Sequence, residues 1–161
     1  MRIAPLFFVV LACGAVGSAK KPKITVRFHV ETNESDGQPF AMPVKFQHPK
    51  RDGFVKRVPT ISERNVEAIF PYPAPDGSFG CAFKLDNFGR TELDLISRTS
   101  RGASMVAFVG TKGGVHQVID MVIDKVVSDG IITISSGLTP MEIETFKKEF
   151  KVLGETGKKK S

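Results

Sequence analysis

The fold is decided by the stretch Phe79-Gly80-Cys81-Ala82-Phe83-Lys84-Leu85-Asp86-Asn87-Phe88-Gly89. Its first half places apolar residues at every second position, a pattern typical of a strand with one buried face. Asp86 then predicts the start of a helix, because its carboxylate can accept hydrogen bonds from the first backbone amides. We expect this helix to run to about Ser100 and to bury a stripe formed by Gly89, Leu93 and Ile96.

A second helix is predicted near the C-terminus, where several start signals coincide. Thr139 can cap the helix, Pro140 suits its first position, and Glu142 completes a capping box with Thr139. The buried face is predicted to continue until Gly154 ends the helix, through Ile143, Phe146, Phe150 and Leu153.

Alternating sequence elsewhere predicts strands. Residues 23–31 and 40–46 flank a polar turn and are predicted to pair as a hairpin over residues 23–47. Further strands are predicted at residues 54–58, 66–72, 105–109, 115–127 and 130–135. The predicted fold class is α+β. We expect one domain, with a mixed or antiparallel sheet, two amphipathic helices on one face, and the β-hairpin in front.

The N-terminus has the layout of a targeting segment. A positive start is followed by an apolar run and then by the small residues Gly17-Ser18-Ala19, which predicts a signal peptide over residues 1–19 with cleavage after Ala19. Val10-Leu11-Ala12-Cys13 also resembles a bacterial lipobox, in which Cys13 would be lipidated. Leu11 is unusual at its position, so cleavage after Ala19 is favoured. We expect an exported protein of the periplasm or cell envelope, with membrane contact only through a lipid at Cys13.

The formal net charge of +6 comes from the two ends of the chain. The segments 1–23 and 154–161 hold seven of the basic residues and one of the acidic residues. The stretch between them contains 16 basic and 16 acidic residues, so its net charge is zero. A nucleic-acid-binding protein would concentrate its basic excess on a structured face. No nucleic-acid partner is therefore expected.

Short motifs follow one another in a recognisable order. A strand leads into Leu85-Asp86-x-x-Gly89, and a strand at 105–109, the turn Gly110–Gly114 and a long strand ending at Ser128-Asp129-Gly130 come next. Ile134-Ser135-Ser136-Gly137-Leu138-Thr139 then opens the last helix. With a capped turn near Ser62, the stretch from about Pro59 to Val152 resembles the head subdomain of the first periplasmic domain of SecD, an accessory subunit of the bacterial preprotein translocase.

The resemblance has departures and limits. Asp120-Met121 stands where the family has Ala-Pro, and Asp129 where it has a turn glycine. SecD also has membrane helices that couple proton flow to movement, and no apolar run of about 20 residues follows residue 19 here. The resemblance thus implies a fold and an affinity for extended polypeptide, without that coupling. It divides the chain into a signal peptide (1–19), an N-terminal β-hairpin extension (20–58), a head-like domain (59–153) and a basic tail (154–161).

Sequence features that could suggest a ligand site have simpler interpretations. Gly110-Thr111-Lys112-Gly113-Gly114 lies between two predicted strands, which favours a hairpin turn over a phosphate-binding loop. The three histidines lack a metal-ligand spacing; the nearest approach is His116 with Asp120, which share a strand face. No metal and no cofactor are predicted.

The nucleophiles and carboxylates do not indicate an enzyme either. Cys81 lies on the apolar face of its strand, which predicts a buried, unreactive thiol. Asp120 and Asp124 share a strand face, and paired carboxylates catalyse only if their environments separate their pKa values; otherwise they charge an exposed face. No catalytic residue is predicted, and a small hydrolase or metal enzyme is the least favoured function.

A partner-binding surface is predicted beside the Pro-rich turn of residues 73–77. Phe70, Tyr72 and Phe79 flank this turn, and an extended peptide could add to an open sheet edge there; the same aromatic residues could equally fill the core. Lys112, in the predicted hairpin turn, is the fourth candidate contact. The predicted function is a noncatalytic protein- or polypeptide-binding module of the cell envelope, related to protein translocation. The alternative is a structural or assembly protein with one dedicated folded partner.

Overall fold

The computed structural model describes residues 23–36 and 40–154. The predicted signal peptide, its cleavage site at Ala19, the lipidation site Cys13 and nearly all of the basic tail lie outside the described residues.

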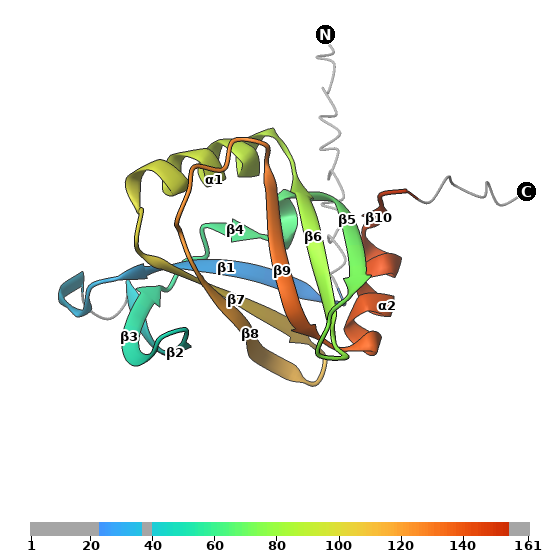
Figure 1. Cartoon of the computed structure of the whole chain (residues 1–161), viewed down its shortest axis with the longest axis horizontal. Helices are drawn as coiled ribbons and strands as arrows, with labels where there is room; N and C mark the ends of the chain where they lie inside the picture. The colour runs from blue at the N-terminus through green and yellow to red at the C-terminus, as the bar shows by residue number, and fades with distance from the viewer. Residues whose placement is uncertain (1–22, 37–39, 155–161) are drawn as a thin grey trace, which may run out of the picture.

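The strands are divided between two sheets (Figure 1). The first sheet contains β1 (Thr25–Thr32), β2 (Ala41–Gln47), β3 (Lys50–Lys56), β4 (Ile61–Ser62), β7 (Ser104–Thr111) and β8 (Gly114–Val122). Its order is β2-β3-β1-β7-β8, with β4 paired to β1, and all its pairs are antiparallel.

The second sheet is smaller and mixed. It contains β5 (Val66–Pro73), β6 (Phe79–Leu85), β9 (Ile131–Leu138) and β10 (Lys151–Val152), in the order β10-β5-β6-β9. The β10–β5 pair is parallel and the other two pairs are antiparallel. Two helices, α1 (Asn87–Thr99) and α2 (Pro140–Glu149), and the 3-10 turns η1 (Glu34–Asp36) and η2 (Glu63–Asn65) complete the described part of the chain. The predicted α+β class is confirmed.

The main core lies between the two sheets. Phe28 of β1 packs edge-to-face on Phe83 of β6 with ring centroids 6.0 Å apart, and Phe83 packs on Phe146 of α2 at 5.5 Å. Leu93 and Ile96 of α1 join the same cluster. The main core thus joins side chains from before and after residue 59. Complete burial of each such side chain contributes about 1.5–3 kcal/mol to stability.

A second, smaller core lies on the opposite face of the first sheet. The β2–β3 hairpin folds over this face and buries Val44, Phe46 and Val55 against Val106 of β7. Alternate residues of β7 therefore face different cores, since Met105 and Ala107 belong to the main one.

The pairing predicted for residues 23–47 is wrong. The structure has a hairpin in this region, but it joins β2 to β3, and β3 separates β2 from β1. β1 is an inner strand whose main partner is β7, with Val26 opposite Val109. Local alternation identified β1 and β2 as strands, but their pairing depends on contacts between residues far apart in sequence.

The predicted helix starts are confirmed. Asp86 Oδ1 accepts a hydrogen bond from the Gly89 amide at 2.7 Å, and Thr139 and Glu142 form the reciprocal capping box of α2. The end predicted for α2 is wrong: the helix stops at Glu149, Phe150 is extended, and the next two residues form β10. Neither helix of the described residues is long and apolar enough to cross a membrane.

Candidate functional site at the open edge of the second sheet

β8 and β9, the edge strands of the two sheets, touch at one end and separate at the other. They touch at Gly137, where a Cβ atom would lie 3.1 Å from Val118 Cγ1; the φ of +94° at Gly137 also favours glycine. Near the same end, His116 Nε2 on β8 lies 2.6 Å from Glu142 Oε1 on α2. Towards the opposite end the strands diverge, and a cleft opens between them.

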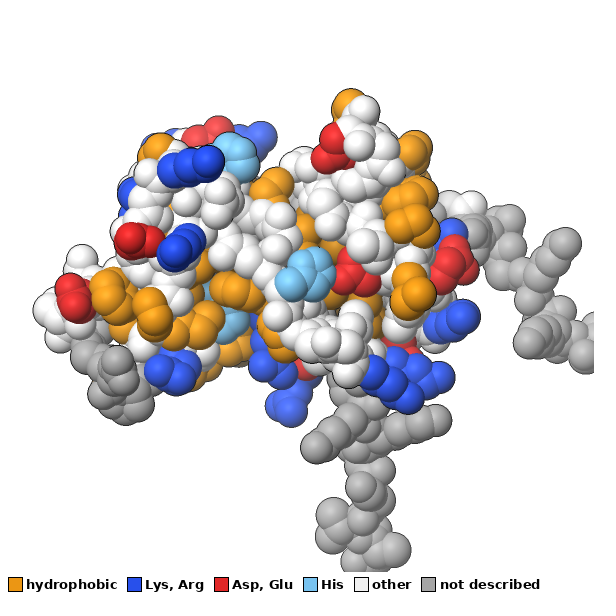
Figure 2. Space-filling view, turned by 90° about the horizontal axis from the view of Figure 1, so that it is seen from below, with side chains coloured by type: hydrophobic (Ala, Val, Ile, Leu, Met, Phe, Trp, Pro, Cys, Tyr) orange, Lys and Arg blue, Asp and Glu red, His pale blue; other side chains and the backbone are white. Residues whose placement is uncertain are grey.

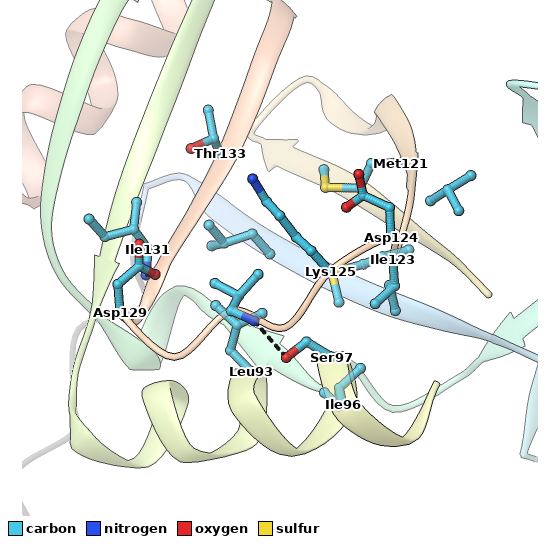
Figure 3. A pocket seen from close by; sticks show the side chains of 14 residues that line it. Leu93, Ile96, Ser97, Met121, Ile123, Asp124, Lys125, Asp129, Ile131 and Thr133 are labelled. Atoms are coloured by element: carbon cyan, nitrogen blue, oxygen red, sulfur yellow. Dashed lines mark hydrogen bonds between the residues drawn. The ribbon is translucent and has the colours of Figure 1, made fainter. Parts of the chain in front are cut away.

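The cleft has a volume of about 350 Å³ and an apolar floor (Figure 3). Its floor is formed by the buried side chains of α1, β7, the segment after β8, and β9: Leu93, Ile96, Met105, Ile123 and Ile132. The partly buried Met121 and Val127 form its walls. Val122 at the end of β8 and Ile131 at the start of β9 are exposed apolar residues that line the cleft. Val126, also exposed, lies in the segment between these two strands. An apolar floor with apolar residues at its margin can bind an apolar group of a partner.

The segment 123–130, which connects β8 to β9, is held mainly by side chains of α1. The buried Ser97 hydroxyl accepts a hydrogen bond from the Val127 amide at 2.9 Å, drawn in Figure 3, and Arg90 Nε donates to the Ser128 carbonyl at 2.8 Å. At its two ends the segment is fixed by backbone bonds, Ile123 N to Ala103 O and Leu85 N to Gly130 O. One wall of the cleft is therefore irregular backbone supported by a helix.

The rim of the cleft is charged. Asp124, Lys125 and Asp129 are all exposed, and Figure 3 shows the Lys125 side chain extending across the cleft towards Thr133. No Lys–Asp or Arg–Asp ion pair involves these three side chains within the described residues. The Asp129 carboxylate accepts a hydrogen bond from the Ile131 amide at 3.0 Å. The guanidinium groups of Arg90 and Arg101 lie at the backbone of the same segment, where they donate to the carbonyls of Ser128 and Asp124, so basic and acidic groups alternate along the rim.

The outer edge of β9 is open. β9 pairs with β6 on one side and has no strand on the other among the described residues. Because Leu85 N donates to Gly130 O, the even-numbered residues at the start of β9 point their backbone groups towards β6. Thr133, opposite Ala82, therefore points its N–H and C=O outwards, beside the cleft.

The edge of β5 is blunted by prolines. β10 covers β5 only at Ala68 and Ile69, and Leu153 N donates to Ile69 O. Since the outward positions alternate from Ile69, Pro71 and Pro73 are the next two. Neither proline has an N–H group, so this stretch offers no amide donor to an added strand.

The edge of β2 is closed by side chains and by a proline. Pro43 occupies an outward position without an N–H group, and the outward Lys45 carbonyl accepts a hydrogen bond from Gln117 Nε2 at 3.0 Å. The outward Gln47 amide donates to both oxygens of Asp120 at 3.1 Å. Side-chain bonds thus occupy backbone groups that would otherwise be free to pair.

The four predicted partner contacts do not form one surface. Phe70 (50% exposed) and Tyr72 lie on the outer face of the second sheet, and the Tyr72 hydroxyl donates to the Ile134 carbonyl at 3.3 Å. Phe79, opposite Pro73, packs partly buried against the main core. Lys112 lies in the β7–β8 turn next to the start of α2.

The histidine–carboxylate pairs differ from the one considered in the sequence. Asp120 is buried and accepts from the His48 amide at 2.8 Å, and the His48 ring Nδ1 lies 3.6 Å from its carboxylate. His116 contacts Glu142 instead. Burial raises the pKa of Glu142, but hydrogen bonds from Thr139 and His116 outweigh it and hold that pKa below its ordinary value. Both carboxylates have structural partners, and on the face seen in Figure 2 a histidine side chain lies beside an acidic one.

Cys81 is a buried free thiol, as the alternation of its strand predicted. Burial raises the pKa of the Cys81 thiol to about 12, which makes the thiolate inaccessible near neutral pH. Within residues 23–36 and 40–154, no group of three or more His, Cys, Asp or Glu side chains could hold a metal ion. The cleft can bind and orient an apolar group, but its lining contains no nucleophile beside a base.

The architecture defines the class of protein: an α+β domain with two packed sheets and a cleft where their edges diverge. Among solved structures it is similar to SecDF, described as a membrane component that enhances protein export, with a TM-score of 0.50 and 10% identity. A second similar structure, SecDF in a super-membrane-facing form, has a TM-score of 0.47 and 13% identity. The first likeness confirms the resemblance predicted from the sequence, and at this identity it concerns the fold alone.

Each match covers 76% of this chain, but this chain spans only 59% of the length of the first SecDF structure and 18% of the second. The chain matches no model of a known protein family and no curated protein.

Sequence reasoning missed the cleft and the β9 edge. The sequence did contain one usable signal, since Pro71 and Pro73 are two residues apart and so share one side of their strand. That spacing indicates an edge protected against pairing, beside the very turn where an open edge was predicted.

Proposed function

We propose that this chain is a noncatalytic module that binds protein or polypeptide partners in the cell envelope, in a role related to protein export. The observation that carries the proposal is the apolar cleft beside the open edge of β9. A floor of buried aliphatic side chains favours an apolar group of the partner. The cleft opens at a strand edge, which favours a partner in extended conformation.

Export is part of the same proposal. Residues 1–19 would direct export and be removed after Ala19, and Cys13 would be retained only if it is lipidated. The intact mass of the mature protein separates these routes, because cleavage after Ala19 removes Cys13 and lipidation makes it the first residue.

The experiment is a binding titration of the full chain with a labelled polypeptide that is kept unfolded by reduction and alkylation. We expect reversible, weak binding, and competition by unrelated unfolded chains but not by the same proteins when folded. Absence of binding to every unfolded chain would contradict the proposal. In that case a single stoichiometric complex with one folded protein would favour the alternative, an assembly protein with a dedicated partner.

A matched pair of positions tests whether the cleft is the site. A photocrosslinking residue at Lys125, on the rim, is expected to capture the unfolded polypeptide. The same residue at Lys112, an exposed lysine in the β7–β8 turn, is expected to capture much less. Equal capture at both positions would contradict binding at the cleft.

A further inference from the structure

We infer that the edge of β9 receives an extended segment of the partner as an added strand, with a basic residue towards Asp129 and an apolar side chain inside the cleft. The inference rests on the proposed function and deepens it, because it specifies how the partner is bound. The Asp129 carboxylate, the apolar cleft and the backbone of Thr133 are the groups that would select this ligand.

The backbone geometry supplies the first step. Thr133 presents one N–H donor and one C=O acceptor at the outer edge, without a strand partner in the described chain. A residue of the partner placed opposite Thr133 can exchange two hydrogen bonds with it, as in an antiparallel ladder. Pro71 and Pro73 prevent this exchange on β5, and Asp120 and Gln117 already occupy outward groups of β2.

Side-chain alternation supplies the second step. The side chain of Thr133 is exposed, whereas its neighbours Ile132 and Ile134 are buried on the core side. A partner residue opposite Thr133 would share its outer face, so the next residue along the partner points to the core side. The cleft lies there, with Met121 and Val127 as its walls. This position selects an aliphatic or aromatic side chain.

The same alternation argues against a second copy of this chain as the occupant. If two β9 strands paired about Thr133, the core-side residues of the incoming strand would be Ile132 and Ile134. These are 5% and 0% exposed, because each already packs in the core of its own molecule. A second copy would therefore leave the cleft unfilled, whereas a free extended segment can fill it.

Charge supplies the third step. Asp129 precedes β9 and Asp124 lies further along the rim, and neither carboxylate forms an ion pair with Lys or Arg in the described part of the chain. Lys125 lies on the same rim, and Arg101 donates to the Asp124 carbonyl and Arg90 to the Ser128 carbonyl, so the attraction is limited to direct contact with the Asp129 carboxylate. A basic residue of the partner near Asp129 therefore gains a modest attraction, which at an exposed site corresponds to an affinity increase of about two- to fivefold.

The test uses three fluorescent ten-residue peptides with alternating Thr and Val and a central Leu. The first ends in Lys, the second ends in Glu, and the third is the first peptide with its central amides N-methylated. Each is titrated into the full chain, into Thr133→Pro and into Thr133→Val. Proline removes the outward N–H, whereas valine keeps it and keeps the β-branched shape.

We expect Thr133→Pro to weaken binding of the Lys peptide by about tenfold or more, and Thr133→Val to change it by less than twofold. The N-methylated peptide is expected to lose a similar factor against the unmodified chain, a comparison that does not depend on the folding of any variant. Unfolding midpoints of the two variants provide the folding control. The Glu peptide is expected to bind more weakly than the Lys peptide.

Other outcomes would overturn the inference. Equal binding by Thr133→Pro and Thr133→Val would exclude strand addition at β9. Val122→Pro, titrated in the same way, removes an amide of β8. If this variant weakens peptide binding and Thr133→Pro does not, the added strand lies on β8. A dimer in sedimentation experiments that Thr133→Pro dissociates would make a second copy the occupant. If the unmodified chain binds no unfolded polypeptide at all, the proposed function itself fails; if it binds them and Thr133→Pro does not weaken binding, only this inference fails.

Discussion

The edges of β2 and β9 show two ways in which the same fold ends a sheet. At β2 a proline, the Gln117 amide and the Asp120 carboxylate leave little backbone free to pair. At β9 the backbone of Thr133 points outwards beside an apolar cleft. Exposed strand edges promote aggregation, and proteins usually protect them. β9, with the edge of β8 across the cleft, is left open where the β2 and β5 edges are protected, so the cleft is the place where a partner strand is expected.

β5 belongs with β2 in this comparison. Its outward positions beyond β10 are Pro71 and Pro73, so it is protected without any side-chain bond. The difference between edges is thus set by a few residues, and substitutions at these residues can reverse it.

The largest expected effect comes from opening the β2 edge with Asp120→Ala. Asp120 is buried and accepts from the Gln47 and His48 amides, so its loss leaves two amides without their acceptor. We expect a loss of about 2–4 kcal/mol in the free energy of unfolding, measured by urea denaturation. Asp124→Ala, an exposed carboxylate on the cleft rim, is the matched control and should change stability by less than about 0.5 kcal/mol.

Opening the β5 edge should create a second binding site. Pro71→Val with Pro73→Val restores two outward amide donors while keeping apolar side chains. We expect the peptide stoichiometry to rise from one to two per chain in a titration with the Lys-ended peptide. An unchanged stoichiometry in a folded variant would mean that prolines are not what protects this edge.

The closed end of the β8–β9 junction depends on Glu142. This carboxylate caps α2 through Thr139 and contacts His116 on β8, and its pKa is lowered in the folded protein. A lowered folded pKa means that the stabilisation is present above the unfolded value, near pH 4.5, and is lost as pH falls through the folded pKa. We expect Glu142→Gln to cost about 1–2 kcal/mol at pH 7.

The pH series supplies the control for that variant. The stability difference between the unmodified chain and Glu142→Gln should shrink as the pH falls from about 5 to 3. A difference that stays constant over this range would show that the charge of Glu142 does not contribute.

The smallest expected effect concerns Lys125. Its side chain crosses the cleft but forms no ion pair with a described residue. Lys125→Ala should change the free energy of unfolding by less than about 0.5 kcal/mol. It should increase the affinity for the Lys-ended peptide by no more than about threefold, because it removes a like charge from the rim. Weaker binding of that peptide would contradict the proposed role of the rim charges.

The sequence predicted what depends on neighbouring residues. Asp86 and Thr139 predict the starts of the two helices, because capping is a contact between residues three positions apart. The strand alternation around Cys81 also correctly predicted a buried thiol. The resemblance to the SecD head then connected these elements in the correct order, and the structural likeness to SecDF agrees with it.

Pairing and edges could not be predicted in the same way. β1 lies beside β3 and β7, and not beside β2, and the two faces of the first sheet pack into separate cores. Phe150 continues the apolar pattern of α2, yet it is extended because the next residues pair with β5. The outward position of Thr133 likewise depends on its register with β6, which is set only when the sheet assembles.

Amide hydrogen exchange of Thr133, followed by NMR with and without the Lys-ended peptide, tests the central claim most directly. The Thr133 amide should exchange rapidly in the free protein and become protected on binding, whereas the already paired Ile132 amide should change little. Protection that appears at Val122 of β8, or nowhere in β9, would contradict strand addition at this edge.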